Sequence, residues 1–494
     1  MINRVVIVGG GTAGWITATL LEKKCANVEI VLIDKEVSTP VAVGEATLLG
    51  FDTFMNVHCG FNQNEWVPET DAVPKASILF PGWGNGKVDQ VWHPFYFPLA
   101  SHDVPLCDAL SHTGEDVRNY LPLYDSALRN EVDLENQQAY SWHIDATKLV
   151  KFLERKLKQN TRLIHLQKEV VEVKHNTEGE VERLILEDNT YVDADLYVDC
   201  TGLKSILKIE RDRVDLKGRL FVDTAVAGHV PYADRDTELK PYTICKVVDS
   251  GWLWDTSLQS RIGSGLVFNR SITDIDQAKE ELCNYWGDRI KPDDLRVIDW
   301  SPYYDRNQWE KNVVSVGLSA GFVEPLESTG IALIIEGANQ LSSYVRGRFY
   351  NQFDINSFNT YMIHLFETGI DFVSMHYDLS TRQSPFWEFV RETYQRSDQL
   401  NIYIDNMKSN TPSIINGKPG MFGGSNWIYW MIQLGYDFTP KNSPDPLFAR
   451  RSLDQYNEFK SQTPNNIVKL NGMTMDDLIV KPIPIFDNDC YTFQ

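Results

Sequence analysis

Residues 4–34 read RVVIVGGGTAGWITATLLEKKCANVEIVLID, and this stretch decides the fold. It begins with the β-branched run Val5–Val8 and a glycine turn, continues with an apolar stretch at Trp15–Leu21, and ends in a second apolar run at Ile30–Ile33. Short β-branched runs predict strands, and the longer apolar stretch between them predicts a helix. The order strand, helix, strand predicts a parallel pair of strands joined by a right-handed crossover.

The glycines after the first run have the spacing Gly9-x-Gly11-x-x-Gly14, and Asp34 ends the second run. In this context the spacing indicates a dinucleotide site. Gly9 allows a tight turn, Gly11 lets the backbone approach a pyrophosphate at the helix N-terminus, and Gly14 lets the helix pack closely. Asp34 is placed to bind ribose hydroxyls. The motif by itself leaves FAD and NAD open.

The composition is that of an ordered globular protein. The chain has 494 residues, of which 43% are hydrophobic and 12% aromatic. At about 150 residues per domain, this length fits several domains or one large α/β domain with a second lobe. The 47 basic and 68 acidic residues give a net charge of −21, which argues against binding to nucleic acid or to an anionic membrane surface.

The seven cysteines are scattered and form no C-x-x-C pair, so the sequence predicts neither a disulfide framework nor a metal site. Glycines interrupt the apolar N-terminal region where a signal peptide would need a continuous run. No apolar run approaches the roughly 18 residues that span a bilayer. We therefore expect a soluble cytoplasmic protein without a membrane segment.

The rest of the chain shows further elements. Residues 50–135 are rich in Pro, Gly, Trp and His, and we interpret them as a largely irregular insertion that lines a pocket, with plain aromatic core as the alternative. Asp145 is placed to cap a helix. Alternating strands are predicted on both sides of the turn at 176–180, and another strand in 195–202. From about residue 335 onward helical stretches dominate.

Two later segments, at 195–205 and 313–331, resemble FAD signatures of single-component flavin enzymes. Over roughly the first 340 residues the chain resembles a flavin-dependent halogenase of the tryptophan-halogenase type. The matching segments follow the order of that family. They are VGGGTAGW at 8–15, VGEAT at 43–47, PKASILFPGW at 74–83, WHPF at 92–95, WHIDATKLVKFL at 142–153, DCTG at 199–202, GWLW at 251–254 and GLSAGFVEPLESTGI at 317–331.

The resemblance implies an enzyme that receives FAD as FADH2 from a separate NAD(P)H flavin reductase. In the family, reduced FAD and oxygen give a flavin hydroperoxide, and halide (chloride, bromide or iodide) attacks it to form hypohalous acid. A lysine then presents this electrophile to a small aromatic substrate. By position in the matching segments, the lysine is Lys75 and its partner glutamate is Glu327. A protonated amine can hold the oxidant beside one ring carbon, and a carboxylate can stabilise the cationic ring and remove its proton.

The same resemblance implies further site residues. Halide binding is implied for Thr329 and Gly330, and a wall between flavin and substrate for Trp252 and Trp254. Substrate contact is implied for His93, Phe95 and Ser328. Cofactor binding is implied for Gly9, Gly11, Thr12, Ala13, Gly14, Asp34, Glu45, Ala46, Asp199, Gly202, Gly317 and Phe322.

Simpler interpretations of these residues stay open. A lone lysine is usually a solvated surface charge, and a glutamate in the sequence PLEST often precedes a helix. Thr329 and Gly330 fit an ordinary loop-to-helix junction, and His93 fits a hydrogen-bonded core histidine. Four aromatic residues at helical spacing fit a core better than a pocket wall, namely Trp387, Trp427, Tyr429 and Trp430.

One segment departs from the family pattern. Its W-x-W-x-I-P signature stands here as Trp252-Leu-Trp254-Asp-Thr256-Ser257. Pro fixes a backbone angle and Ile supplies an apolar wall, so the change predicts a looser or wetter wall near the flavin, unless the backbone is unchanged. In the C-terminal part we find no site for an amino-acid carboxylate and ammonium group, so free tryptophan is not the expected substrate.

The expected fold class is α/β (α+β), with a GxGxxG Rossmann-type FAD-binding domain of the flavin monooxygenase kind, a β-sheet insertion and a helical C-terminal lobe. Residues 1–340 would form the FAD-binding halogenase module and residues 341–494 a mainly helical substrate-binding lobe. The expected activity is halogenation of an electron-rich arene such as an indole or phenol. A flavin-dependent aromatic hydroxylase and a non-catalytic flavin-binding protein are the alternatives, and a homo-oligomer is left open.

Overall fold

The computed structural model describes residues 1–35, 43–95, 106–120, 124–134, 140–159, 162–409, 420–436, 445–461 and 467–470. Its base is a six-stranded sheet in which five strands run parallel and one edge strand, β21, runs antiparallel. In order across the sheet, the strands are β21 (Trp309–Glu310), β22 (Val313–Ser315), β13 (Leu196–Asp199), β1 (Arg4–Val8), β2 (Glu29–Asp34) and β9 (Leu163–Gln167).

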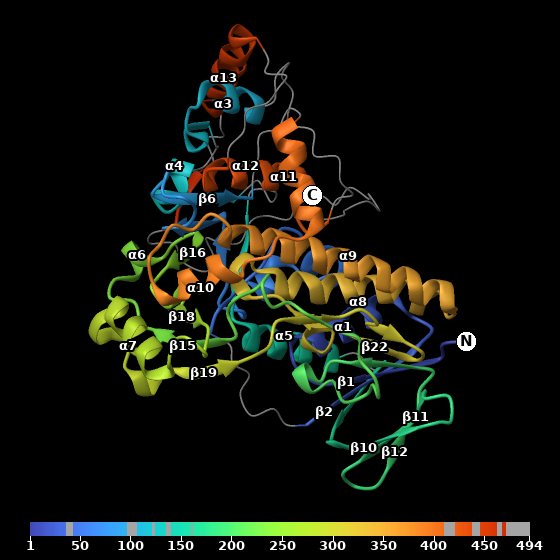
Figure 1. The fold of residues 1–494 in the computed structure, drawn as a ribbon. Coiled ribbons are helices and arrows are strands. Elements are labelled where there is room, and N and C mark those ends of the chain that lie inside the picture. The colour runs from blue at the N-terminus through green and yellow to red at the C-terminus, as the bar shows by residue number, and fades with distance from the viewer. Residues whose placement is uncertain are drawn as a thin grey trace.

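The predicted strand–helix–strand unit is confirmed, because β1 and β2 pair in parallel on either side of helix α1 (Thr12–Lys24). The helix is longer than the apolar stretch that predicted it. It packs against α5 (Ala146–Lys158) and α8 (Thr329–Gly347). Figure 1 shows α8 beside α9 (Gln352–Tyr377), the two together covering this sheet. Burial of apolar faces between sheet and helices drives this arrangement.

A second sheet of seven strands corrects one prediction. Residues 50–135 are not mainly irregular, because β5 and β6 lie in this region and complete the sheet, β5 pairing in parallel with β16. Their short runs are broken by Pro and Gly, so only long-range pairing reveals them as strands. In order, the strands are β19 (Arg296–Asp299), β15 (Thr224–Val230), β18 (Ile262–Phe268), β17 (Gly251–Ser257), β16 (Tyr242–Val247), β5 (Ser77–Pro81) and β6 (Gln90–Pro94).

Two local predictions are confirmed. Asp145 caps α5, since its side chain accepts a hydrogen bond of 2.9 Å from the backbone N–H of Lys148. The turn at 176–180 joins the antiparallel strands β10 (Val170–His175) and β11 (Val181–Leu186), and β12 (Tyr191–Val192) adds a third strand. Both features rest on local sequence signals, a capping side chain and a polar turn between alternating runs.

Besides the sheet of β10, β11 and β12, the described residues form three further small sheets. The most important for function consists of β3 (Glu45–Ala46), β8 (Ser141–Ile144) and β4 (Val73–Lys75), because Lys75 ends β4. The others are β14 (Arg213–Asp215) with β20 (Tyr303–Asp305) and β23 (Gly321–Phe322), and β7 (Glu131–Asp133) with β24 (Ile467–Lys469).

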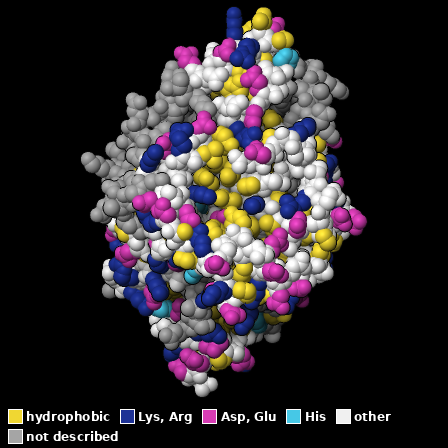
Figure 2. Space-filling model, turned by 90° about the vertical axis from the view of Figure 1, so that its left-hand side faces the viewer, with side chains coloured by type: hydrophobic (Ala, Val, Ile, Leu, Met, Phe, Trp, Pro, Cys, Tyr) yellow, Lys and Arg dark blue, Asp and Glu magenta, His cyan; other side chains and the backbone are white. Residues whose placement is uncertain are grey.

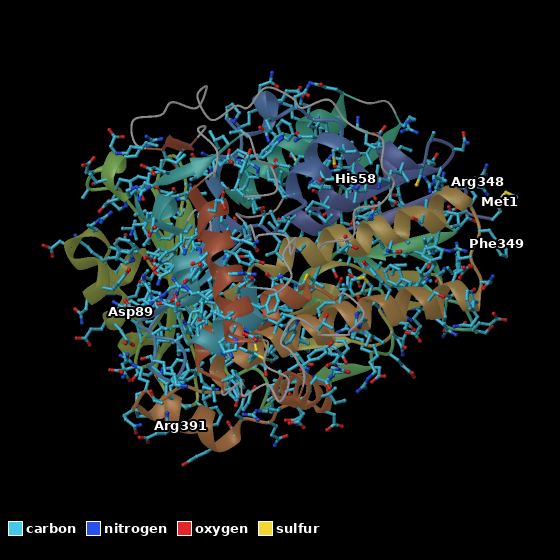
Figure 3. All side chains as sticks on the ribbon, turned by 90° about the horizontal axis from the view of Figure 1, so that it is seen from above. Met1, His58, Asp89, Arg348, Phe349 and Arg391 are labelled. Carbon is cyan, nitrogen blue, oxygen red and sulfur yellow. The ribbon has the colours of Figure 1, made fainter. Side chains whose placement is uncertain are left out.

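Helices dominate the described C-terminal residues, as predicted. Residue 340, the predicted end of the first module, lies inside α8. Figure 3 places Met1, Arg348 and Phe349 together at one end of the molecule, where the N–H of Ile2 donates to the carbonyl of Arg348. The remaining α-helices are α2 (Gln63–Trp66), α3 (Leu106–Thr113), α4 (Tyr124–Leu128), α6 (Arg235–Glu238), α7 (Ile275–Trp286), α10 (Pro385–Thr393), α11 (Asp398–Ser409), α12 (Gly424–Leu434) and α13 (Pro446–Ser461).

Short helical turns place several site residues. They include the π-helix η1 (Thr53–His58) and the 3₁₀ turns η2 (Val117–Tyr120), η3 (Gly202–Lys204), η4 (Gly287–Arg289), η5 (Pro292–Asp294), η6 (Gly317–Ser319) and η7 (Pro325–Glu327).

Three further observations concern the charges on the surface, metal-binding side chains and membrane-spanning helices. Figure 2 shows acidic and basic side chains interspersed around a central apolar area on one face. Among the described residues there is no group of three or more His, Cys, Asp or Glu side chains arranged to hold a metal ion. Within the same part of the chain, no helix combines the length and the hydropathy needed to cross a bilayer.

Candidate active site

Glycine turns gather at one edge of the six-stranded sheet. The parallel strands β1, β13 and β22 each end in such a turn, and Gly9, Gly202 and Gly317 adopt positive φ angles of 114°, 72° and 74° there. Non-glycine residues rarely adopt this backbone conformation. The turns η3 and η6 contact each other. A nucleotide site at the carboxyl ends of adjacent parallel strands is the usual arrangement in such sheets.

The fingerprint glycines fit a bound pyrophosphate. A Cβ at Gly11 would meet no atom within 4 Å, so this position faces open space, whereas a Cβ at Gly14 would lie 1.8 Å from the Gly9 carbonyl. Gly11 is the N-cap of α1, no side chain caps it, and the first turn holds no acidic residue. Thr12 and Ala13 form that first turn. Free N–H groups at a helix N-terminus favour an anion, so these residues fit the pyrophosphate of FAD.

The predicted polar cofactor residues already have protein partners. Asp34 accepts a hydrogen bond of 2.7 Å from Nε2 of His165, which leaves its second oxygen for a ribose. Glu45 accepts a bond of 2.8 Å from the N–H of Ala146, and burial raises the pKa of Glu45 to about 8. Ala46 follows it in β3 and is half-buried.

Asp199 is fully buried and shapes the neighbouring turn. Its carboxylate accepts hydrogen bonds from the N–H groups of Thr201 and Leu207. The side chain therefore holds the shape of the loop that carries Gly202. Phe322, at the end of β23, packs its ring at 5.6 Å and 84° against Trp300.

Lys75 contacts residues of three other segments that resemble the halogenase family. It has 0% exposure, and its Nζ donates hydrogen bonds of 2.9 Å to Oγ of Ser328 and 3.2 Å to the carbonyl oxygen of Thr47. The same Nζ lies 4.9 Å from the ring centre of Phe95. The lysine is therefore not a solvated surface charge.

Glu327 is also fully buried, and both of its oxygens have imidazole partners. Its Oε2 lies 2.9 Å from Nδ1 of His93, and its Oε1 lies 2.6 Å from Nε2 of His376. On the other side of its ring, Nε2 of His93 lies 3.1 Å from Oδ1 of Asn426. The carboxylate is thus held in one orientation by two rings.

The environment moves the pKa values of both key groups. Burial lowers the pKa of Lys75 to about 7, although the Glu327 carboxylate acts in the opposite direction. Burial alone would raise the pKa of Glu327, but the charge of His93 and the hydrogen bonds from His376 and His93 bring it to about 2. Burial also lowers the pKa of His376, against the effect of its hydrogen bond to Glu327. Perturbed groups of opposite charge in one buried cluster are typical of catalytic sites.

The residues predicted to bind halide begin α8. Ser328 precedes the helix with a positive φ of 61°, and no side chain caps it. The Oγ1 of Thr329 is buried and has no hydrogen-bond partner among the described residues. A Cβ at Gly330 would meet nothing within 4 Å. A helix N-terminus with an unpartnered hydroxyl and adjacent open space suits a small anion.

The predicted wall residues lie on β17. Trp252 is fully buried and its Nε1 donates a 3.0 Å hydrogen bond to the hydroxyl of Tyr377, which in turn donates 2.5 Å to Oε1 of Glu324. Trp254 is half-buried, and its ring lies where a Cβ at Gly265 would be.

The segment that departs from the family pattern stays inside β17. Thr256 and Ser257 pair with β18 and are 2% and 4% exposed. The backbone is therefore regular strand at both positions, and neither side chain opens this strand to solvent.

The four C-terminal aromatic residues are buried, as the core interpretation predicts. Trp430 is nevertheless close to the site, since its ring centre lies 3.9 Å from that of His376 and 5.8 Å from that of His93. Sequence reasoning did not identify His376, which lies in α9 beyond the matching segments. Sequence reasoning also missed Glu324 and Tyr377, whose contact depends on the packing of α9 against η7.

The comparisons with known proteins agree with this geometry. The family model for tryptophan halogenase matches residues 4–451. The tryptophan 6-halogenase ThaL of Streptomyces albogriseolus is 29% identical over 489 residues, covering 91% of this chain and 92% of that protein. The tryptophan 7-halogenase RebH of Lentzea aerocolonigenes is 29% identical over 443 residues, covering 83% and 84% of the two chains.

Solved structures show the same fold. A tryptophan halogenase of Shewanella frigidimarina superposes with a TM-score of 0.87 at 25% identity, covering 97% of this chain and 98% of that one. A flavin-dependent halogenase of Xanthomonas campestris superposes with a TM-score of 0.84 at 26% identity, covering 94% and 97%. The fold class predicted from the sequence is confirmed.

The matched family model and the similar proteins show that this chain is a flavin-dependent halogenase, an enzyme that uses FAD for electrophilic halogenation of aromatic substrates. Within that class, the chain belongs to the tryptophan halogenase family.

Proposed function

We propose that this enzyme halogenates an electron-rich aromatic ring of the indole or phenol type, with Lys75 and Glu327 as its catalytic residues. The observation that carries the proposal is the 2.9 Å hydrogen bond from Lys75 to Ser328, which fixes the amine beside the residue that follows Glu327. Reduced FAD, oxygen and halide together supply hypohalous acid. The work of the protein is to hold that oxidant beside one ring carbon.

Lys75 is suited to this task by its burial. With a pKa of about 7, it exchanges between amine and ammonium near neutral pH. An ammonium group donates a hydrogen bond to the oxygen of hypohalous acid, while the neutral amine offers a lone pair to the halogen. Thr47 and Ser328 hold Nζ in place during either interaction. The oxidant is thereby kept from leaving by diffusion.

Glu327 supplies the opposite charge. As the halogen adds, the arene carries a positive charge, which the carboxylate stabilises in a buried environment of low dielectric. The carboxylate then accepts the proton that leaves the ring carbon. His93 and His376 fix its orientation, so that little reorganisation accompanies the reaction.

The cofactor and halide sites follow from the glycine turns. We assign the FAD pyrophosphate to the N-terminus of α1 at Gly11–Ala13, with Gly202 and Gly317 lining the same edge, and a ribose to Asp34. We assign halide to the N–H groups and hydroxyl at Thr329 and Gly330. Trp252 and Trp254 separate the cofactor from the substrate, and Phe95 with His93 faces the arene.

The finer biological setting belongs to the same proposal. FADH2 arrives in trans from an NAD(P)H flavin reductase, and the protein works in the cytoplasm, either alone or as a homo-oligomer. The curated relatives are named as tryptophan halogenases. In the sequence of the C-terminal part we identified no site for an amino-acid carboxylate and ammonium group, so we place the substrate among indoles and phenols without them. In this proposal residues 1–340 form the FAD-binding halogenase module, which includes Phe95 and His93, and residues 341–494 form a mainly helical lobe that completes the substrate site.

The test is a halide-dependence screen by mass spectrometry. Purified protein, FAD, a flavin reductase with NADH, oxygen and catalase are combined with a panel of indoles and phenols in chloride, bromide, iodide or no halide. Halogenated product that requires halide supports the proposal. Oxygenated product without halide would identify a hydroxylase, and peroxide alone on every arene would contradict the proposed substrate class.

A further inference from the structure

His376 makes two hydrogen bonds that together fix its protons. Its Nδ1 lies 2.8 Å from the carbonyl oxygen of Phe372, one turn earlier in α9, and its Nε2 lies 2.6 Å from Oε1 of Glu327. A carbonyl oxygen only accepts hydrogen bonds, so Nδ1 must carry a proton. The tautomer of the ring is thus set by the backbone of its own helix.

Because the tautomer of His376 is fixed, His376 and Glu327 form a pair that holds one shared proton. With Nδ1 protonated, the 2.6 Å contact to Glu327 is a hydrogen bond only when a proton lies on Nε2 or on Oε1. The two forms are imidazolium with carboxylate, and neutral imidazole with carboxylic acid. Without that proton, a lone pair would face a carboxylate in a fully buried site, which is costly.

Aromatic packing leaves the ring no other position. The ring of Trp430 lies 3.9 Å away by centroid, Phe80 lies 5.3 Å away from β5, and Phe372 lies 5.4 Å away. The titratable groups around the pair come from several elements. They are Lys75 on β4, His93 on β6, Cys245 on β16, Glu324 just before η7, and Tyr377 at the end of α9. Of these groups, His93 also hydrogen-bonds Glu327, and the others act on the cluster through their charges.

Resting on the proposed function, we propose that His376 is a positioning residue that stores the proton which Glu327 gives and recovers in each turnover. When the carbon–halogen bond forms, the oxygen–halogen bond of hypohalous acid breaks, and the departing hydroxide needs one proton to leave as water. When the carbon–hydrogen bond of the ring breaks, one proton is released. Glu327 delivers the first and accepts the second, and the pair ends with the single proton it had at the start.

The fixed tautomer is testable without turnover. In protein labelled with ¹⁵N-histidine, one ring resonance should keep its Nδ1 proton from pH 6 to 9 and should vanish in H376Q. If the resonance lost in H376Q instead carries its proton only on Nε2, the proposal is wrong. If H376Q does not fold, E327Q takes its place. In E327Q the ring of His376 loses the shared proton but should keep its proton on Nδ1.

The role in turnover is tested by a pH profile. The glutamine of H376Q donates a hydrogen bond to Glu327 but holds no exchangeable proton. Because burial lowers the pKa of His376, the wild-type pair holds its proton mainly on the acidic side of neutral pH, and kcat of H376Q should fall about tenfold to a hundredfold there. The ratio of wild-type to H376Q kcat should then shrink as pH rises and the wild-type pair loses its proton. H175Q makes the same substitution at a half-buried histidine on β10, whose Nε2 lies 3.0 Å from the carbonyl oxygen of Leu207, and should leave the shape of the profile unchanged.

The outcomes separate the two proposals. Wild-type protein that forms no halogenated product contradicts the proposed function, whatever the histidine spectrum shows. Active wild-type protein with a kcat ratio that is constant across pH, as a purely structural role predicts, contradicts the stored proton alone.

Discussion

Nζ of Lys75 donates a 2.9 Å hydrogen bond to Oγ of Ser328, across 253 positions of sequence. The contact joins the end of β4 to the residue between η7 and α8, so that the amine lies beside the backbone that carries Glu327. It also uses the unusual backbone of Ser328, whose φ of 61° turns the chain before the helix. The distance between amine and carboxylate is therefore set by framework elements.

Removing the hydrogen bond between Lys75 and Ser328 should allow more hypohalous acid to escape from the site. In S328A, Lys75 keeps only the Thr47 carbonyl as a protein acceptor, and loss of one hydrogen bond to a charged group corresponds to about a tenfold drop in kcat/KM. More hypohalous acid should escape, which a thiol trap in the assay measures. S342A, which removes a buried hydroxyl bonded to Asn339, is the control. An unchanged ratio of trapped oxidant to halogenated product in S328A would show that the contact does not confine the oxidant.

Two glycines of the fingerprint should respond in opposite ways to the same substitution. G11A places its Cβ in open space at an ordinary φ of −80°, so the fold should survive while FAD binding weakens at least tenfold. G14A forces its Cβ to within 1.8 Å of the Gly9 carbonyl and should destabilise the protein itself. Thermal unfolding and flavin fluorescence titration distinguish the two effects. Normal FAD affinity in a folded G11A protein would argue against the assigned pyrophosphate position.

The hydroxyl of Thr329 should matter for halide and little for stability. T329V keeps the shape of the side chain and removes an oxygen that has no partner among the described residues, so Tm should stay nearly constant. The KM for halide should rise several-fold, with the KM for the arene unchanged. T19V removes a hydroxyl bonded to the Trp15 carbonyl and serves as the matched control. Equal halide KM values in T329V and wild type would place the anion elsewhere.

Glu324 should make the protein less stable at alkaline pH. Burial raises its pKa to about 8, against the hydrogen bond from Tyr377. Between its ordinary pKa of 4.5 and about 8, the folded state binds a proton that the unfolded state has lost. Stability therefore falls as pH rises through this window, by at most about 1.4 kcal/mol per pH unit.

E324Q removes this titration, so its advantage in unfolding free energy over wild type should grow from pH 5 to 8 and then level off. Denaturant unfolding at several pH values measures the difference. E392Q, at an exposed position on α10, should show no such trend. A difference for E324Q that stays constant with pH would mean that Glu324 is ionised in the folded protein.

The sequence predicted those parts of the molecule that depend on local signals. The β1–α1–β2 unit, the Asp145 cap of α5 and the hairpin of β10 and β11 are each encoded within about 30 residues or fewer. Lys75 and Glu327 were found because they lie in short segments that resemble the family. The sequence predicted their roles only; the structure adds that both side chains are buried and that the charge of Glu327 acts on the pKa of Lys75.

The parts that sequence reasoning missed depend on long-range packing. β5 is a short apolar run that ends at Pro81, and its place in the seven-stranded sheet depends on pairing with β16, more than 160 positions later. His376 reaches Glu327 only because α9 packs against η7, and a single histidine on a buried helix face carries no motif. In both cases the information lies in contacts between distant segments, which local periodicity does not encode.

The most direct test of the account compares wild type with K75M under halogenating conditions, with product measured by mass spectrometry and FAD binding measured separately. Methionine fills the buried volume without an amine, so the fold and FAD affinity should be kept, with stability equal or higher because a buried charge is removed. The account predicts that halogenated product falls at least a hundredfold in K75M, while K246M, at a half-buried lysine on β16, keeps wild-type activity. Regioselective halogenation by K75M at the wild-type rate would contradict it.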